Sequence, residues 1–476
     1  MEKRASIPPG LPKPSPTVSY WQDPPSDIAG LRTTSKLPTS ADYIIIGSGI
    51  SGACIAHNLL SKKPNASVLM LEARTACSGA TGRNGGHTKA ASYRSFLEHE
   101  RELGLEEAVK IARLEYENII ATHRLAKEYG IQCDSNPCQT VDIIHSQTQL
   151  DEGKRAIARM RQVLGEGDPA AKYEILEDAE EVESRFLTPG ALGAFTYFAG
   201  SISAYAFAIG MLKVSLEQGL NLQTNTPAHS IERKGDLWEV KTSRGMVSSP
   251  NVILATNGYT AHLLKSMQGV IVPLHGQVVA QRPGSRLPNG GSLDYTYSFI
   301  YENGYEYMIT RPPGSRHEGD MVIGGGLGKL PNDGESQYGN TDDTALSSTI
   351  TFYLRDCTAD YFGDNWGEDH PHGRVRKEWS GIMGASADGL PYVGSVPDSP
   401  GLWMSACFNG HGMVWCLKSA EALVATLVGD RAEQIVIDRW FPRSARLTKE
   451  RMSRKFGGRV DLKVPGEAKF GVRSRL

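Results

Sequence analysis

The chain has 476 residues and a formal net charge of −2, with 40% hydrophobic and 22% charged residues. This length allows two or three folding units with a large core, and the composition is typical of a soluble globular protein. The small net charge gives no electrostatic basis for binding nucleic acid or an anionic membrane, and no apolar run is long enough to span a bilayer. We therefore expect neither nucleic acid nor a membrane among its partners.

Residues 1–40 are rich in Pro, Ser and Thr, and Tyr20 and Trp21 are the aromatic residues among them. We expect an irregular arm that these two rings attach to the body of the protein. The first residues lack the apolar segment of a secretory signal. The seven scattered cysteines are typical of free thiols in a reducing compartment, and we expect no metal site.

The segment 42–72 has the order strand, glycine-rich turn, helix, strand and terminal acid. Tyr43–Ile46 is an apolar run without a polar break, which predicts a strand buried on both faces. Apolar residues recur at helical spacing over Ile50–Leu60, Val68–Leu71 is a second buried strand, and Glu72 follows it. This order predicts a dinucleotide-binding unit far more strongly than glycine spacing alone.

Each part of that unit has a physical role in holding a dinucleotide. Gly47 allows a tight turn, Gly49 allows the backbone to approach a pyrophosphate, and Gly52 allows close packing of helix and strand. The helix start offers unpaired N–H groups to the phosphates. Glu72 can accept hydrogen bonds from the ribose hydroxyls of the adenosine. Because an acid disfavours the 2′-phosphate of NADP, NAD and FAD remain as the candidate ligands.

The middle of the chain mixes helices with strands of antiparallel type. Helical periodicity extends over Leu97–Tyr129 with an expected break at Gly104. Further strands are predicted at 141–145, 192–200, 228–233, 237–242, 251–255, 270–281, 295–302, 306–311, 321–325 and 401–406, and further helices at 147–163, 205–218, 341–362 and 413–429. The βαβ pieces at 41–90, 190–260 and 375–430 predict an α/β protein whose dinucleotide domain is assembled from separate stretches of chain.

Three further segments have the features of a flavin site. Gly79–Thr88 (GATGRNGGHT) suits close approach to a flat ring, and Val252–Gly258 (VILATNG) is a buried strand that ends in small residues. Gly410–Gly412 is expected at a helix start, where N–H groups would stabilise negative charge at the N1–C2=O edge of a flavin. A flexible loop, a plain strand end and an ordinary helix cap are the alternative interpretations. The glycines of 324–328 precede no helix, so they do not predict a second dinucleotide site.

Together these segments resemble the D-amino-acid-oxidase-like (DAO) superfamily of FAD-dependent oxidoreductases, as does Trp379–Gly394 with its Asp388 and Pro391. The chain is most similar to the branch of sarcosine oxidase, glycine oxidase and gamma-glutamylputrescine oxidase, in its fungal type with a Pro-rich arm. The resemblance implies FAD, a Rossmann-type FAD-binding domain and a substrate domain roofed by a mainly antiparallel sheet. It also implies oxidation of a C–N bond by hydride transfer to flavin N5, hydrolysis of the imine, and reoxidation by O2 to hydrogen peroxide.

The resemblance and the motifs together give domain ranges and cofactor contacts. The expected ranges are 1–40 for the arm, 41–95, 190–265 and 373–435 for the FAD-binding domain, 96–189 and 266–372 for the substrate domain, and 436–476 for a C-terminal tail. The predicted cofactor-binding residues are Gly47, Gly49, Ile50, Ser51, Gly52, Glu72, Ala73, Arg74, Thr81, Arg83, Asn84, Gly85, Gly86, His87, Thr256, Gly258, Gly410, His411, Gly412 and Met413.

The chain also departs from the family pattern where relatives attach the flavin covalently. Sarcosine-oxidase-like enzymes carry a flavin-linked cysteine in the stretch that corresponds to Gly381–Ala387, and this stretch has none. Histidyl-linked relatives place a histidine near the position of Arg83, and this chain has no histidine at that position. We therefore predict noncovalent FAD, with His87 as the residue that could overturn the prediction.

The substrate side departs from the family pattern as well. Family members bind a substrate carboxylate with basic residues at the positions of Ser92 and Val414, and Lys89 and Arg94 are the nearest substitutes. A small amino acid held by a bidentate arginine is therefore not the expected substrate.

The aromatic residues Tyr301, Tyr305 and Tyr307 are expected in the roof, and such a wall suits a larger amine of apolar or cationic character. Either His411 or Lys89 is expected to supply positive charge for the reduction of O2. These two are the candidate catalytic residues, because hydride transfer from a neutral amine needs no general base.

Two other functions remain open from the sequence. One is an FAD-dependent dehydrogenase or biosynthetic tailoring enzyme that acts on a bulky amine, and the other is a flavin-binding protein without redox turnover. The chain ends in Ser474-Arg475-Leu476, a variant of the S-K-L peroxisomal signal. We therefore expect recognition by the peroxisomal import receptor, and a cytoplasmic location otherwise.

Overall fold

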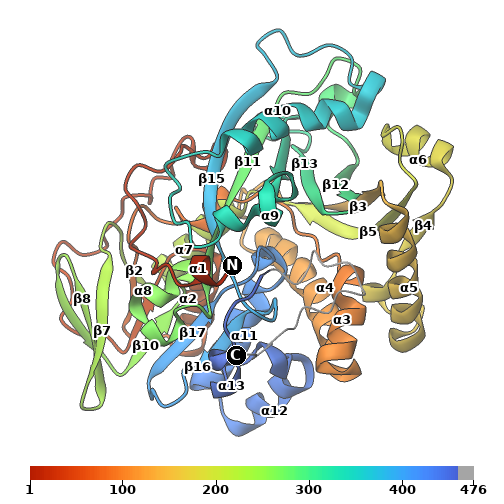
Figure 1. The fold of residues 1–476 in the computed structure, drawn as a ribbon. Helices are drawn as coiled ribbons and strands as arrows, with labels where there is room; N and C mark the ends of the chain where they lie inside the picture. The colour runs from red at the N-terminus through yellow and green to blue at the C-terminus, as the bar shows by residue number, and fades with distance from the viewer. Residues whose placement is uncertain (459–476) are drawn as a thin grey trace.

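A six-stranded sheet contains the two strands of the predicted dinucleotide unit as neighbours (Figure 1). In spatial order its strands are β16 (Tyr392–Ser395), β17 (Leu402–Ala406), β10 (Asn251–Leu254), β1 (Tyr43–Ile46), β2 (Val68–Leu71) and β6 (Asn221–Gln223). The strands are parallel except for β16, which runs antiparallel to β17. The structure is a computed structural model that describes residues 1–458, so the predicted targeting signal Ser474-Arg475-Leu476 lies outside the described residues.

Both faces of this sheet are covered, which explains the unbroken apolar strands. One face packs against α2 (Ile50–Lys62), α7 (Ala204–Glu217) and α11 (Cys416–Val428). The other packs against an antiparallel sheet of β7 (Ala228–Lys234), β8 (Leu237–Thr242) and β9 (Gly245–Ser249). Within β1 the side chains alternate between these layers: Ile45 joins the helical core, whereas Ile44 joins the core that contains Trp238.

An eight-stranded sheet forms the second large layer and is antiparallel except where β3 and β12 pair. In spatial order its strands are β15 (Val375–Ala385), β11 (Val272–Gln281), β14 (Met321–Gly325), β13 (Gly304–Thr310), β12 (Tyr295–Tyr301), β3 (Asn136–Ile144), β5 (Gly193–Ser201) and β4 (Glu174–Leu176).

Helices pack on both faces of the eight-stranded sheet. On one face lie α3 (Tyr93–Leu103), α4 (Leu105–Glu128) and α5 (Gln147–Leu164), and on the other lie α6 (Ala179–Phe186) and α10 (Ser348–Phe362). The shorter or peripheral helices are α1 (Glu2–Ala5), α8 (Thr260–Leu263), α9 (Pro331–Gly334), α12 (Arg431–Trp440) and α13 (Lys449–Ser453). Gly104, with a φ of 90°, separates α3 from α4 as predicted.

The predicted α/β class is confirmed. Two strands, however, lie in a different sheet from the one that the expected domain ranges imply. Strand β5 lies inside the range 190–265 and β15 inside 373–435, yet both belong to the eight-stranded sheet. The reason is long-range pairing, because β5 pairs with β3 over its whole length and β15 pairs with β11. The helix predicted over 341–362 begins only at Ser348.

The arm of residues 1–40 is irregular except for α1 and a single 3-10 turn, and its two aromatic rings are buried in the body. The Tyr20 hydroxyl donates to Asp320 Oδ2 at 3.0 Å, and Trp21 Nε1 donates to the carbonyl oxygen of Asn84 at 2.6 Å. The arm is therefore attached to the glycine-rich loop that contains Asn84.

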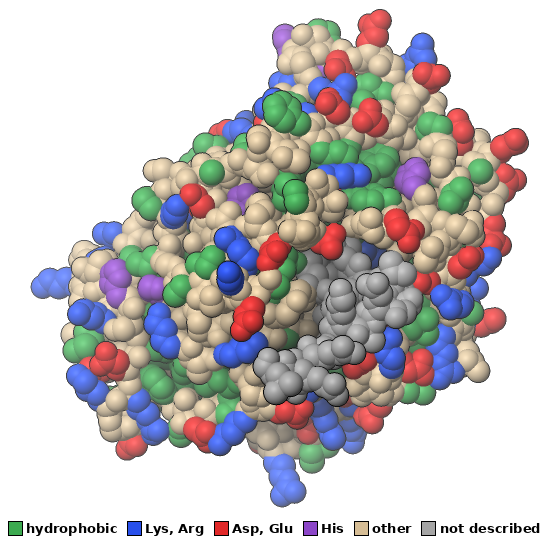
Figure 2. Space-filling view, viewed as in Figure 1, with side chains coloured by type: hydrophobic (Ala, Val, Ile, Leu, Met, Phe, Trp, Pro, Cys, Tyr) green, Lys and Arg blue, Asp and Glu red, His purple; other side chains and the backbone are tan. Residues whose placement is uncertain are grey.

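The described surface mixes both signs of charge. On the face that Figure 2 shows, Lys and Arg side chains are interspersed with Asp and Glu. Within residues 1–458, no helix combines the length and the apolarity that crossing a bilayer requires.

Candidate cofactor and substrate site

A cavity of about 350 Å³ is lined by residues of both large sheets. Its volume lies within the range of roughly 300–1,000 Å³ that is usual for ligand sites.

The cavity begins at the carboxyl ends of the central parallel strands. Ile46 and Leu71, the last residues of β1 and β2, line it, and so does Ala255 directly after β10. In open α/β sheets this edge is where ligands bind. The opposite wall comes from β11, β13 and β15 of the second sheet, so the dinucleotide edge faces the substrate roof directly.

The turn between β1 and α2 has room for glycine alone at two positions. Gly47 has a φ of +108°, and a Cβ there would lie 2.5 Å from the carbonyl oxygen of Ala255. A Cβ on Gly52 would lie 2.0 Å from the carbonyl oxygen of Gly47. Gly52 thus sets the close packing of α2 on β1 and does not itself line the cavity.

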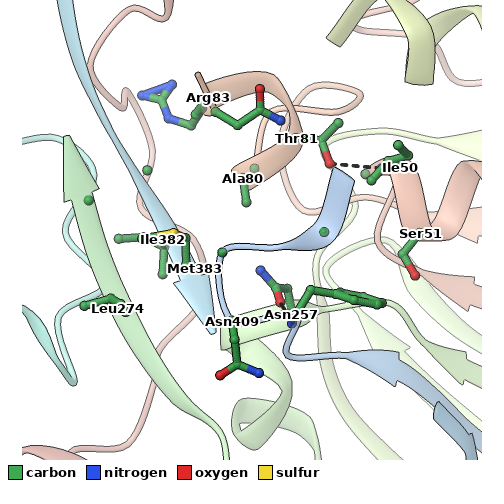
Figure 3. A pocket seen from close by; sticks show the side chains of 18 of the residues that line it. Ile50, Ser51, Ala80, Thr81, Arg83, Asn257, Leu274, Ile382, Met383 and Asn409 are labelled. Atoms are coloured by element: carbon green, nitrogen blue, oxygen red, sulfur yellow. Dashed lines mark hydrogen bonds between the residues drawn. The ribbon is translucent and has the colours of Figure 1, made fainter. Parts of the chain in front are cut away.

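Thr81 meets the first turn of α2 at the cavity. The backbone N–H of Ile50 donates to Thr81 Oγ1 at 3.0 Å, as Figure 3 shows. Ser51 instead turns its hydroxyl toward β17 of the same six-stranded sheet, where it donates to Ser405 Oγ at 3.1 Å. The helix start therefore presents backbone groups, and not the Ser51 hydroxyl, to a ligand.

Glu72 is held in a fixed orientation at the end of β2. Its Oε2 accepts from the N–H and the hydroxyl of Ser48, at 3.1 and 2.7 Å, and its Oε1 accepts from the N–H of Arg74 at 2.9 Å. A carboxylate has about four acceptor sites, so it retains capacity for a ribose hydroxyl.

Three buried polar atoms of the cavity lining have no hydrogen-bond partner among the described residues, namely Arg83 Nη1, the Tyr259 hydroxyl and His262 Nε2. Arg83 is otherwise satisfied, because Nε donates to the carbonyl oxygen of Ser380 at 2.7 Å and Nη2 to Thr17 Oγ1 at 2.9 Å. Burial lowers the pKa of Arg83 to about 10, although Asp343 opposes this shift. Orphaned donors of this kind are expected where a ligand rich in acceptors binds, so the residues fit FAD.

Most of the predicted cofactor contacts reach the cavity. Those that line it are Gly47, Gly49, Ile50, Ser51, Glu72, Ala73, Arg74, Thr81, Arg83, Asn84, Gly85, His87, Thr256, Gly410, His411, Gly412 and Met413. Gly86 and Gly258 lie behind the lining, like Gly52. A Cβ on Gly86 would lie 3.0 Å from the Trp21 ring, and one on Gly258 would lie 2.2 Å from the carbonyl oxygen of Met383. These glycines allow the close packing of the loops behind the cavity lining.

The segment around Gly410–Gly412 differs from the predicted helix start. A 3-10 turn covers Gly412–Val414, Trp415 leaves the helical region with φ −132° and ψ −37°, and α11 begins only at Cys416. The segment is held instead by Asn257, whose Oδ1 accepts from the N–H groups of Cys407 and Phe408 at 3.0 and 3.3 Å. Figure 3 shows Asn257 beside this segment.

Lys89 forms a buried ion pair on the substrate side of the cavity. Its ammonium contacts Asp142 Oδ1 and lies 2.5 Å from Ser298 Oγ, and the Lys89 and Asp142 side chains are 7% and 0% exposed. Asp142 Oδ2 also accepts from the hydroxyls of Tyr93 and Tyr197, at 2.7 and 2.9 Å. Burial lowers the pKa of Lys89, while Asp142 opposes the shift.

His87 is the other titratable group close to Lys89. Its Nε2 lies 2.5 Å from Thr296 Oγ1, and desolvation, together with the charge of Lys89, holds its pKa well below the usual range. The imidazole is therefore neutral at physiological pH. The one cysteine of residues 1–458 that lines the cavity is Cys416.

Strand β13 turns alternate side chains toward and away from the cavity. Tyr305 and Tyr307 line it, and the guanidinium of Arg94 lies 4.0 Å from the centre of the Tyr305 ring. Tyr301 is not at the cavity, because its hydroxyl donates to the buried Glu306 Oε1 at 2.8 Å. Of the three tyrosines predicted to form the wall, Tyr305 and Tyr307 therefore do so and Tyr301 does not.

Three residues that support the site were not predicted from the sequence. Asp142 is one, and Glu115 and Asn118 of α4 are the others. Glu115 accepts from the Ser92 hydroxyl and from Trp415 Nε1, the latter at 3.0 Å.

Asn118 binds the segment that follows His411. Its Nδ2 donates to the carbonyl oxygen of Met413 at 3.0 Å, and its Oδ1 accepts from the N–H of Lys418 at 2.9 Å. A signal existed in the sequence, because Asp142 interrupts an apolar strand and Glu115 and Asn118 fall on the apolar face of a helix.

Comparisons with known proteins agree with this geometry. The family model described as DAO, FAD dependent oxidoreductase, matches residues 42–426. A probable oxidoreductase OrdL of Haemophilus influenzae is 25% identical over 397 residues, which cover 82% of this chain and 83% of that protein. A glycine oxidase of Pseudomonas aeruginosa is 26% identical over 223 residues, which cover 46% of this chain and 53% of that protein.

Solved structures show the same fold. The glycine oxidase of Geobacillus kaustophilus matches with a TM-score of 0.67 at 19% identity, covering 87% of this chain and 99% of that one. An L-amino acid deaminase of Proteus vulgaris matches with a TM-score of 0.64 at 16% identity, covering 86% of this chain and 95% of that one. Because the family model covers most of the chain, the protein belongs to the DAO family of FAD-dependent oxidoreductases, and its cofactor is FAD.

Proposed function

We propose that the protein oxidises a C–N bond of an amine or amino acid and passes the electrons to O2, which is released as hydrogen peroxide. The observation that carries this proposal is the continuous cavity that joins the dinucleotide edge to the pocket of Lys89, Arg94, Tyr305 and Tyr307. Relatives named glycine oxidase and L-amino acid deaminase support the class of substrate.

FAD supplies a two-electron acceptor, the N5 atom, for a hydride from the carbon that carries the amine. The chain then has to bind that amine in its neutral form and to align its C–H bond. The guanidinium of Arg94 lowers the pKa of an amine placed beside it, because like charges disfavour its protonation, and Lys89 adds to this effect only in part because Asp142 compensates its charge. The neutral His87 adds no third charge.

The charges of the lining also favour a substrate that carries a carboxylate. Lys89 and Arg94 line the substrate side, whereas the one carboxylate among the described lining residues is Glu72 at the dinucleotide edge. Asp142 compensates the Lys89 ammonium without lining the cavity, so a purely cationic amine meets repulsion mainly from Arg94 and finds no acid in the lining on this side. The charges therefore outweigh the tyrosine wall, which alone favours an apolar or cationic amine.

Reduction of O2 develops negative charge, and Lys89 and His411 are the cavity residues proposed to stabilise it. His411→Ala is expected to slow either reduction or reoxidation of the flavin in stopped-flow measurements. If both rates are unchanged, His411 has no part in the mechanism.

A panel of amines and amino acids, read by peroxide release under air, tests the proposal. We expect turnover with stoichiometric peroxide, and carboxylated amines should exceed their decarboxylated counterparts. Turnover with an artificial acceptor but without peroxide would indicate a dehydrogenase or a tailoring enzyme. Failure of every compound to reduce the flavin would indicate a flavin-binding protein without turnover.

The attachment of FAD is tested separately. We propose noncovalent binding, because no cysteine stands in Gly381–Ala387 and His87 is engaged with Thr296. Acid precipitation should release the flavin into the supernatant, whereas a yellow pellet would show covalent attachment.

Import into peroxisomes through Ser474-Arg475-Leu476 also stays a prediction.

A further inference from the structure

The N-terminal arm contributes residues to the cavity itself. Gly10, Leu11 and Pro12 are among the residues that line it. On one side of them the carbonyl oxygen of Pro9 lies 3.3 Å from His262 Nδ1. On the other side the carbonyl oxygen of Lys13 accepts from Arg74 Nη1 at 3.0 Å. The arm thus crosses the cavity from α8 to the segment that follows β2.

Arg74 connects the arm to the expected ribose acceptor. Its N–H donates to Glu72, and its Nη1 pairs with Asp343 Oδ2 at 2.9 Å. The carbonyl oxygen of Asp343 in turn accepts from the N–H of Thr17 at 2.8 Å. The Asp343 side chain is 1% exposed, so this network is shielded from solvent. The arm and Glu72 therefore belong to one polar network at the adenosine end of the site.

The next part of the arm holds the glycine-rich loop of the same site. Ser19 Oγ donates to the carbonyl oxygen of Gly82 at 2.6 Å, and Trp21 Nε1 donates to that of Asn84 at 2.6 Å. Arg83 of this loop donates to Thr17 in return. The loop and the arm are fixed by each other, so a ligand that orders one also orders the other.

The proline-rich composition of the arm keeps the loss of conformational entropy on ordering small. Five of the nine residues from Pro8 to Pro16 are prolines, which restrict the unbound segment before it binds. The stretch has few apolar anchors of its own, since Leu11 is half-buried and Lys13, Pro14 and Ser15 are exposed. Contacts at the cavity therefore decide whether this stretch stays in place.

We propose that Gly10–Pro12 form the outer wall of the adenosine end of the FAD site, so that the arm and bound FAD stabilise each other. This goes beyond the proposed oxidation, and it rests on FAD occupying the cavity and not on the identity of the substrate.

A matched pair of variants tests the proposal. Leu11→Ala removes apolar contact from the cavity wall, whereas Val18→Ala changes an arm residue that is 61% exposed and does not line the cavity. Dissociation of FAD is followed by the rise of flavin fluorescence after dilution. We expect Leu11→Ala to release FAD roughly 5- to 10-fold faster than the wild type, and Val18→Ala to release it at the wild-type rate. Equal rates for all three proteins would overturn the proposal.

Amide hydrogen exchange of the wild type gives a second test that does not depend on a variant folding. The amides of Gly10, Leu11 and Lys13 should exchange at least about tenfold more slowly with FAD bound than after its removal. The amide of Gly235 in the turn between β7 and β8 serves as the control and should not change. Equal exchange of the arm in both forms would contradict the proposal. A protein that binds no FAD at all would instead contradict the cofactor assignment.

Discussion

At the scale of single residues, the two buried carboxylates Asp142 and Glu115 have opposite surroundings. Asp142 faces the ammonium of Lys89 and two tyrosine hydroxyls, whereas Glu115 is bonded to the uncharged Ser92 and Trp415. Burial raises the pKa of Glu115 to about 7, although both hydrogen bonds oppose the shift. Lys89 compensates the negative charge of Asp142, whereas burial disfavours the negative charge of Glu115.

Glu115→Gln should therefore change the pH dependence of stability. The unfolded carboxyl has a pKa of about 4.3, so between about pH 4.3 and 7 the folded state holds a proton that the unfolded state has lost. The stabilisation that Glu115 contributes is fully present below about pH 4.3 and is lost as the pH rises through about 7. Between about pH 5 and 8 the wild type should lose up to ~3 kcal/mol more than the variant. Unfolding midpoints at both pH values measure this, and parallel pH profiles would contradict it.

The Lys89–Asp142 pair should show strong coupling in a double-mutant cycle. Lys89→Met leaves a buried carboxylate without its cation and should cost about 3–5 kcal/mol of stability. Lys89→Met combined with Asp142→Asn should recover much of this loss, because the uncompensated charge is gone. Lys418→Met, at a pair whose Glu421 is 44% exposed, is the control and should cost below ~1 kcal/mol. Additive losses in denaturant unfolding would contradict the coupling.

At the scale of elements, the site depends on how closely α2 packs on β1. The strand, the glycines and the helix are neighbours in the sequence, so this unit was predictable from local pattern alone. The support from α4 was not, because Asn118 and Met413 are 295 residues apart in the sequence. The break at Trp415 was also missed, since apolar spacing continues through it and only the tertiary contact of its indole with Glu115 marks the position.

Gly52→Ala should separate α2 from β1. The new Cβ would lie 2.0 Å from the carbonyl oxygen of Gly47, so the helix has to move and the phosphate-facing turn moves with it. We expect the variant to purify with little FAD and with a lower unfolding temperature. Gly167→Ala is the matched control, because nothing lies within 4 Å of its Cβ and Gly167 does not line the cavity. Comparable flavin-to-protein absorbance ratios in the two variants would show that the close packing does not hold the cofactor site.

At the scale of the whole molecule, one cavity receives residues from both large sheets and from the arm. The sequence predicts the dinucleotide edge well because each of its signals is local. The sequence predicts the substrate side poorly, because the pairing of distant strands decides which side chains meet at the cavity. The parallel pairing of β3 with β12 brings Asp142 beside Ser298, and the hydrogen bond from Tyr301 of β12 to Glu306 holds that tyrosine away from the cavity. The arm residues Gly10–Pro12 have no local signal for a ligand, and only their placement assigns them to the site.

The most direct measurement of the central claim is an anaerobic titration of the purified protein with the amine and amino-acid panel, followed by flavin absorbance. At least one carboxylated amine should bleach the bound flavin, and admitting O2 should restore the oxidised spectrum with release of peroxide. Dithionite reduces the flavin directly and serves as the control. A flavin that dithionite bleaches but that no amine or amino acid reduces would contradict the account.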